Sequence, residues 1–152
     1  MKTTAYAENK KALFDYEILE KYEAGLVLTG QEVKSVRTGH IGLKGSFVTF
    51  HGNQAMLTNA HIAKYRYSGE VKNYDPERSR LLLLKRKEIN YLRGKSQEKG
   101  LTIVPLSVYN KGRTIKVQIA VARGKKKYDK REAIKKRELD REVSRKIKEL
   151  YN

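Results

Sequence analysis

Hydrophobic and polar residues alternate along several short segments of the chain, a pattern typical of half-buried β-strands. Phe14, Tyr16 and Ile18 alternate with other, mostly charged residues, and the apolar segment Ala24–Leu28 continues this strand. Gly25 lies inside it, and a glycine within a strand favours a bulge or a bend. The pattern therefore predicts one long strand that begins near Phe14.

Two further pairs of apolar segments predict β-hairpins, because each pair flanks a short group of turn-forming residues. The first hairpin joins Ser46–Phe50 to Gln54–Ile62 through Gly52–Asn53, and the second joins Leu101–Tyr109 to Thr114–Ala122 across residues 110–113.

Helical signals are fewer. Gln31–Arg37 lies between two glycines and predicts a short helix that ends before Gly39. Asp75–Gln97 predicts a helical insertion, with Asp75 as the N-cap, Pro76 in the first turn and Gly94 as the stop. The order of strands, helical insertion and strands predicts a mainly β fold with flanking helices, built around a small closed barrel of the OB-fold type.

Charge divides the chain into two parts. The protein has 152 residues and a formal net charge of +17, with 34 Lys and Arg against 17 Asp and Glu. We expect residues 1–123 to form the barrel domain and residues 124–152 to form a basic tail. Such an excess of positive charge favours a polyanionic partner.

The tail has too few apolar residues to form a core, so we expect it to be disordered when free and helical when bound. The helical prediction rests on spacing, since Leu139, Val143, Ile147 and Leu150 would form one apolar stripe on a helix.

Several functions lack support in the sequence. The chain has no cysteine, and its three histidines, His40, His51 and His61, lack metal-ligand spacing. No phosphate-binding glycine loop and no catalytic pair of carboxylates stands out. The longest purely apolar run is Leu81–Leu84, far too short to span a membrane. We therefore expect a cytoplasmic, non-catalytic protein without a cofactor or small-molecule substrate.

Tyrosines beside basic residues give a positive indication of RNA binding. The chain has ten tyrosines and no tryptophan, and tyrosines alternate with cations in Lys64–Tyr67 and Lys127–Lys130. Such rings can stack on unpaired bases while the cations contact phosphates. Packing in the core is the simpler explanation for Tyr16, Tyr22 and Tyr109.

Eight ordered motifs resemble the SsrA-binding protein family, also called small protein B, and the match runs from about Asn9 into the tail. Small departures occur at Val36, Arg123 and Leu139. The motifs are Glu23–Leu26, Leu28–Arg37, Asn59–Ile62, Asp75–Pro76, Arg78–Leu83, Gly100–Leu106, Ile119–Lys126 and Tyr128–Arg131.

The resemblance implies a bacterial factor that binds the tRNA-like domain of transfer-messenger RNA and brings it to stalled ribosomes for trans-translation. It also implies that the tail enters the empty message channel and meets the decoding centre. The positions matching the family's RNA-binding surface, or its support, are Asn9, Lys10, Glu23, Gly25, Lys34, Arg37, Asn59 and His61. Those matching the segment at the decoding centre are Gly124, Lys125, Lys126, Tyr128, Asp129, Lys130 and Arg131.

Some alternatives remain open from the residues alone. Glu23 could accept hydrogen bonds from a base or hold an arginine, or it could merely neutralise a neighbouring lysine. A permanent ribosomal or assembly protein would explain the charge and the tail, although not the ordered motifs. An RNA-processing enzyme would need an acid–base pair that the sequence does not offer. A membrane-surface role has less support, because the tail's apolar stripe lacks Trp and Phe.

Overall fold

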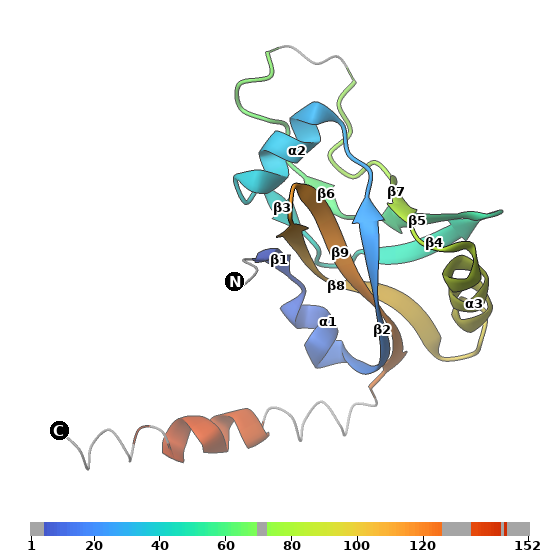
Figure 1. Ribbon diagram of the computed structural model, residues 1–152. Helices are drawn as coiled ribbons and strands as arrows, with labels where there is room; N and C mark the ends of the chain where they lie inside the picture. The colour runs from blue at the N-terminus through green and yellow to red at the C-terminus, as the bar shows by residue number, and fades with distance from the viewer. Residues whose placement is uncertain (1–4, 70–72, 126–134, 144, 146–152) are drawn as a thin grey trace.

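The computed structural model describes residues 5–69, 73–125, 135–143 and 145. Its main feature is one seven-stranded antiparallel sheet in the order β1-β8-β9-β2-β7-β5-β4, and β3 pairs with β6 in a separate two-stranded sheet (Figure 1). The strands are β1 (Ala5–Glu8), β2 (Tyr16–Leu26), β3 (Ile41–Gly42), β4 (Phe47–His51), β5 (Gln54–Thr58), β6 (His61–Ile62), β7 (Arg80–Leu83), β8 (Leu101–Lys111) and β9 (Thr114–Gly124).

Both predicted hairpins are present, but the second strand of the first ends at Thr58, and His61–Ile62 forms β6 in the other sheet. Phe47 pairs with Thr58 and His51 with Gln54 in the first, while Leu101 pairs with Arg123 in the second. The long strand is also confirmed and alternates between half-buried and exposed residues up to Glu23. Its bulge lies between Ile18 and Glu20 rather than at Gly25.

The sheet is not a closed barrel, which corrects the closed-barrel prediction. Within the described residues the ladder ends at β1 on one edge and at β4 on the other, although β4 comes alongside β8 in space. Asn9 occupies this edge of β8: its backbone N–H donates to the Leu106 carbonyl at 2.8 Å, and its Nδ2 donates to the Pro105 carbonyl at 2.9 Å. Pro105 has no N–H to offer a pairing strand. This part of the edge of β8 thus pairs with the backbone N–H and the side chain of Asn9 instead of with β4.

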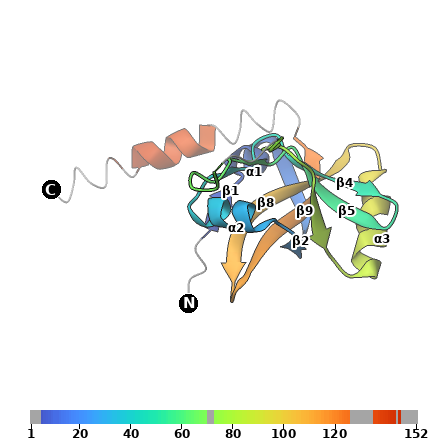
Figure 2. The same ribbon diagram turned by 90° about the horizontal axis from the view of Figure 1, so that it is seen from above.

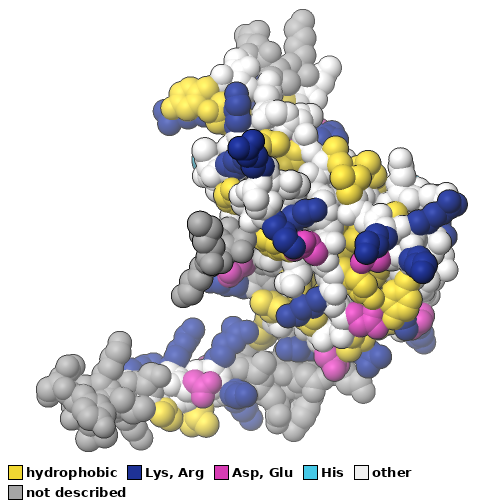
Figure 3. Space-filling model, viewed as in Figure 1, with side chains coloured by type: hydrophobic (Ala, Val, Ile, Leu, Met, Phe, Trp, Pro, Cys, Tyr) yellow, Lys and Arg dark blue, Asp and Glu magenta, His cyan; other side chains and the backbone are white. Residues whose placement is uncertain are grey.

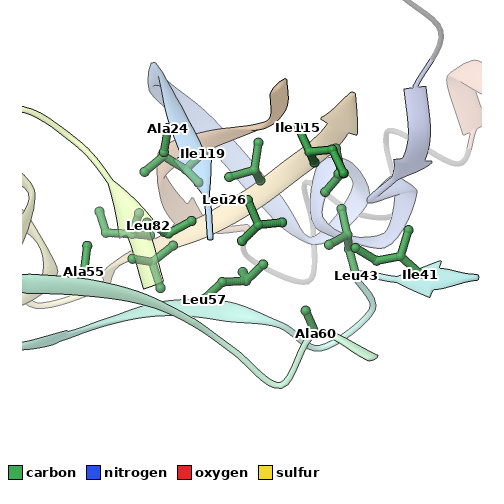
Figure 4. Close-up of a cluster of buried hydrophobic side chains, with 14 of the residues drawn as sticks. Ala24, Leu26, Ile41, Leu43, Ala55, Leu57, Ala60, Leu82, Ile115 and Ile119 are labelled. Carbon is green, nitrogen blue, oxygen red and sulfur yellow. The ribbon is translucent and has the colours of Figure 1, made fainter. Parts of the chain in front are cut away.

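The core lies inside the curl of the sheet. Side chains of β2 and β9, among them Leu26 and Ile119, face those of β5 and β7, among them Leu57 and Leu82 (Figure 4). These four residues are at most 8 % exposed. Burial of such side chains supplies the main favourable free energy of folding.

Three helices flank the sheet: α1 (Lys10–Asp15), α2 (Gly30–Arg37) and α3 (Arg86–Ser96). Seen from above, α2 and α3 lie on opposite sides of the fold (Figure 2). The predicted helix at residues 31–37 is confirmed, and Gly39, with a φ of 83°, follows it as predicted. Glycine adopts such a left-handed conformation without steric cost.

The sequence pattern was wrong at two helices. Phe14 belongs to α1 rather than to the strand, because Asn9 caps a helical turn there. The predicted insertion at residues 75–97 is helical only in α3, since Arg80–Leu83 forms a strand in which Leu82 is buried and Leu83 is exposed. Asp75 caps only a turn, accepting from the Glu77 N–H at 2.9 Å. Gly94 lies inside α3.

Beyond β9, the Lys125 N–H donates to the Asp15 carbonyl at 2.8 Å. Residues 135–143 are helical, and Leu139 and Val143 on that segment are 61 % and 50 % exposed. Ile147 and Leu150, the other two residues of the predicted stripe, lie outside the described residues.

Candidate nucleic-acid interface

Helix α2 presents two cations to solvent. Lys34 and Arg37 are exposed and lie one helical turn apart, so both side chains leave the same face. The helix begins in a capping box, in which Thr29 Oγ1 accepts from the Glu32 N–H at 3.3 Å and Glu32 Oε1 accepts from the Thr29 N–H at 3.0 Å. Both cations follow Glu32, and Arg37 ends the helix, where the negative end of the helix dipole stabilises positive charge.

A buried ion pair fixes the base of this helix. Glu32 and Arg80 are 1 % and 0 % exposed, and Arg80 Nε donates to Glu32 Oε2 at 2.8 Å. Arg78, which is half-exposed, donates to Glu32 Oε1 at 2.5 Å. Burial raises the pKa of the Glu32 carboxyl, but the Thr29 N–H and the two arginines outweigh burial and hold that pKa below its ordinary value. Glu32 is therefore a carboxylate that locks α2 to β7.

The same arginine holds the segment that contains Asn59 and His61. Arg80 Nη1 donates to the Ala60 carbonyl at 2.7 Å. Asn59 adopts a left-handed conformation, with a φ of 65°, and its side chain is exposed. His61 is also exposed, with Nδ1 3.7 Å from a Glu77 carboxylate oxygen. The strand β6, which begins at His61, contacts α2, so this segment lies beside the helix that carries Lys34 and Arg37.

A second cluster lies around Glu23. Its carboxylate accepts from the Tyr109 hydroxyl at 2.5 Å and from Lys111 Nζ at 3.0 Å. The hydrogen bond from Tyr109, followed by that from Lys111, lowers the pKa of Glu23. Burial and the bond to Glu23 raise the pKa of Tyr109 above its ordinary value. In the protein alone, Glu23 thus neutralises a lysine, and its side chain stays partly exposed to solvent.

Arg37 connects the two clusters. Its Nη2 donates to the Arg113 carbonyl at 3.1 Å, in the turn that follows Lys111, the last residue of β8. Basic side chains outnumber acidic ones on this side of the molecule, where Figure 3 shows Lys and Arg in several separate groups.

Gly25 supports this surface without presenting a side chain. It pairs with Lys116 of β9 and with Leu83 of β7, at the point where β2 passes from one neighbour to the other. A Cβ atom added at Gly25 would lie 3.2 Å from the Leu83 Cβ, closer than ordinary van der Waals contact. The close approach of the two strands explains the glycine.

Asn9 and Lys10 lie elsewhere. Asn9 is 4 % exposed and serves three structural groups, since its Oδ1 accepts from the Ala12 N–H and its Nδ2 reaches the Leu43 and Pro105 carbonyls. Lys10 is exposed at the start of α1, which Figure 1 places near the opposite end of the sheet from α2. The structure therefore does not bring these two residues together with Lys34 and Arg37.

Some important residues escaped prediction. Lys111 and Arg113 were visible as cations in a predicted turn, but nothing in the sequence joined them to Glu23 and Arg37. The pairing of Glu32 with Arg80 spans 48 positions and has no local signal. Of the predicted tail positions, Gly124 ends β9 and Lys125 contacts Asp15, while Lys126, Tyr128, Asp129, Lys130 and Arg131 lie outside the described residues.

Two features are absent from the described part of the chain. No cluster of three or more metal-ligating side chains occurs among those residues. No helix within them is long and apolar enough to cross a membrane.

The fold is a curled β-sheet with exposed cations on α2 and on the β8–β9 turn beside it. These features define a protein of the class that binds polyanions. Comparison with known proteins identifies the family. Residues 6–149 match the family model described as SmpB protein, and the chain belongs to that family.

Relatives in other bacteria agree. The chain is 52% identical over 142 residues to a protein of Chloroflexus aggregans named SsrA-binding protein, covering 93% of this chain and 90% of that one. It is 50% identical over 147 residues to a protein of the same name from Gloeothece citriformis, covering 97% and 95%. A solved structure described as "tmRNA-SmpB: a journey to the center of the bacterial ribosome" matches with a TM-score of 0.67 and 47% identity, over 84% of this chain and 92% of that chain.

Proposed function

We propose that this protein is a non-catalytic RNA-binding factor that binds the tRNA-like domain of transfer-messenger RNA and delivers it to stalled ribosomes for trans-translation. Membership of the SmpB family and the names of its relatives support this proposal. The structural observation that carries the proposal is the group of solvent-exposed cations Lys34, Arg37 and Lys111, here called the cationic face. A factor that acts on ribosomes would work in the bacterial cytoplasm.

Within this proposal the curled, OB-like sheet offers RNA a rigid surface. The likeness to an OB-fold rests on the curl of β4 toward β8. At the seam, where these two strands come alongside each other, Asn9 takes the place of strand pairing. The charged groups that contact the RNA then sit on strands and on one helix, which hold their positions better than a loop would. Asn9 and Gly25 contribute by shaping the surface.

The chain from Gly124 onward acts separately, as a basic tail that occupies the empty message channel and meets the decoding centre. Of its 29 residues, 12 are Lys or Arg and 6 are Asp or Glu, which suits a negatively charged RNA groove. Message and tail would compete for this groove, so the tail would detect that the channel is vacant. The tail would lose conformational entropy on becoming ordered, and binding would offset that loss only on ribosomes whose channel holds no message.

Filter retention tests the RNA-binding part. The full chain and a variant ending at Lys125 are titrated with transfer-messenger RNA and with a complete tRNA across a series of salt concentrations. We expect much tighter binding of transfer-messenger RNA, with little effect of tail removal. Equal affinity for both RNAs, falling steeply with salt, would show phosphate attraction alone and would favour a permanent ribosomal protein.

Tagging of nascent chains on stalled ribosomes tests the tail. The variant ending at Lys125 should bind transfer-messenger RNA and yet fail to support tagging. Tagging at the normal rate by this variant would disprove the role of the tail and would leave RNA binding by the sheet intact.

A further inference from the structure

A small cluster of aromatic and basic side chains projects from the loop that follows β6. The Tyr65 and Tyr67 rings meet edge to face, with centroids 5.6 Å apart. Lys34 Nζ lies 5.7 Å from the Tyr65 centroid, and the Arg66 guanidinium lies 5.7 Å from the Tyr67 centroid. Both distances are within the range of cation–π attraction. Hydrophobic and basic side chains gather on this loop at the upper left of Figure 3.

Tyr67 adds little to the core of the protein. Its exposed fraction is 75 %, the highest among the exposed large hydrophobic residues of the described chain. Its ring contacts are with Tyr65 and Arg66, its neighbours in the same loop. Most of the ring is therefore open to a ligand, and replacement of Tyr67 should leave the fold unchanged.

The base of the loop is held in place. Ser35 Oγ, on α2, donates to the Ala63 carbonyl at 2.6 Å, and the Tyr74 hydroxyl donates to the Ile62 carbonyl at 2.6 Å. A turn follows, in which the Ser68 hydroxyl donates to the Tyr65 carbonyl at 2.7 Å. These bonds hold the tyrosine pair beside Lys34, so less order has to be gained on binding.

We propose that Tyr65 and Tyr67 form a stacking subsite for one unpaired base of the RNA partner, with Lys34 and Arg66 contacting the phosphates beside that base. This inference rests on the proposed function and adds to it the chemistry that one part of the surface recognises. A flat ring can stack only on a base that has left its helix, because the faces of paired bases are covered by their neighbours.

The charges of the cluster favour RNA over an acidic protein. None of the ion pairs between described side chains involves Lys34 or Arg66, so both cations are available to an anion. An unpaired nucleotide offers a flat apolar face and a phosphate a few ångströms apart, matching a ring flanked by a cation. Lys34 belongs also to the cationic face of α2, so the subsite extends that face.

Substitution of Tyr67 in the full chain separates stacking from other roles. Tyr67→Phe keeps the ring, whereas Tyr67→Leu keeps an apolar side chain without a flat face. The matched control is Tyr91→Leu on α3, since Tyr91 is 42 % exposed and has Lys95 Nζ 5.6 Å from its ring centroid. Each protein is titrated with transfer-messenger RNA and with isolated small ribosomal subunits, so that the two sources of the base are distinguished.

We expect Tyr67→Leu to weaken binding to one of the two RNAs by about 5- to 150-fold, the usual effect of losing one stacked base. Tyr67→Phe and Tyr91→Leu should stay within about twofold of the unmodified protein. Acylation of RNA 2′-hydroxyls reports which nucleotides are flexible. One unpaired nucleotide should lose its reactivity when the unmodified protein or Tyr67→Phe binds. The same nucleotide should stay reactive when Tyr67→Leu binds.

Three outcomes would overturn the subsite. Unchanged affinity of Tyr67→Leu for both RNAs, with an unchanged acylation pattern, would exclude stacking while the proposed function stands. An equal loss in Tyr67→Phe would assign the effect to the hydroxyl instead of the ring. If the unmodified protein shows no preference for transfer-messenger RNA over a complete tRNA, the proposed function fails, and the subsite fails with it.

Discussion

Arg80 and Glu32 form an ion pair that solvent does not reach, with Arg80 Nη2 2.7 Å from Glu32 Oε2 and exposed side-chain fractions of 0% and 1%. The pair joins three segments that support the cationic face. Glu32 belongs to α2 and Arg80 to β7. The Arg80 guanidinium also donates to the Ala60 carbonyl, between Asn59 and His61. Stability and the geometry of the surface therefore depend on the same contact.

Replacement of Arg80 by Met should lower the free energy of unfolding by about 3–5 kcal/mol, because it leaves the Glu32 carboxylate buried without its main partner. Urea unfolding measures the loss. The control is Arg78→Met, which removes the half-exposed partner of the same carboxylate and should cost about 1 kcal/mol or less. Equal losses in the two variants would mean that burial of Arg80 does not determine the strength of the pair.

The same carboxylate predicts a dependence of stability on pH. The pKa of Glu32 is lower in the folded protein than in the unfolded chain, where a glutamate titrates near about 4.3. The stabilisation is then complete above that value and is lost as the pH falls through the folded pKa. The difference in unfolding free energy between the unmodified protein and Glu32→Gln should thus be greatest near pH 7 and should shrink below about pH 4.

Urea unfolding of both proteins between about pH 3 and pH 7 measures this difference. The carboxyls of Glu20 and Glu23 also have lowered pKa values, but both are present in each protein and cancel in the comparison. A difference that stays constant down to pH 3 would contradict the assignment to Glu32.

Local patterns were enough to predict the parts of the fold that depend on neighbours in sequence. Helix α2 has its Thr29 cap at one end and Gly39 at the other, and both hairpins have alternating strands around glycine turns. The strand at Arg80–Leu83 could not be separated from the helix that follows it, because a run of four leucines fits either structure.

The site was predicted less completely, for a physical reason. Lys34 and Arg37 are adjacent on a helix and could be paired by spacing alone. The contacts that place them, from Arg80 to Glu32 and from Arg37 to the Arg113 carbonyl, join positions 48 and 76 residues apart. Only the folded sheet brings such residues together, and the roles of the tail residues beyond Lys125 stay predictions.

Asn9 should matter for stability and not for direct contact with RNA. Asn9→Ala removes the N-cap of α1, worth about 1 kcal/mol, and leaves the Leu43 and Pro105 carbonyls without that donor, at roughly a further 1–3 kcal/mol. Asn9→Asp keeps the cap acceptor but turns a carboxylate oxygen toward two carbonyl oxygens, so it should be destabilised as well.

Urea unfolding gives the loss in each variant, and filter retention at a temperature where both stay folded gives the affinity for transfer-messenger RNA. We expect affinities within about twofold of the unmodified protein, because a side chain that is 4 % exposed cannot reach a ligand. A large loss of affinity in a fully folded Asn9 variant would show that the seam shapes the RNA surface directly.

Tyr109 and Lys111 should control the ionisation of Glu23 to different degrees. Tyr109→Phe removes the hydrogen bond that lowers the Glu23 pKa most, and Lys111→Met removes the next largest cause. Both variants should raise that pKa toward its ordinary value, with the larger rise in Tyr109→Phe. Titration of the Glu23 side-chain carboxyl by NMR measures the rise, and no change in Tyr109→Phe would mean that the hydroxyl does not donate to this carboxylate in solution.

Lys34 and Arg37 should act on RNA through charge. Replacement of either by Ala removes one phosphate contact, so the slope of log affinity for transfer-messenger RNA against log salt should become shallower by about 1. The control is Lys87→Ala, which removes one exposed cation from α3, on the opposite side of the fold (Figure 2). Binding across a salt series gives the three slopes. The same change of slope in Lys87→Ala would mean that net charge, and not the face formed by α2, determines the attraction.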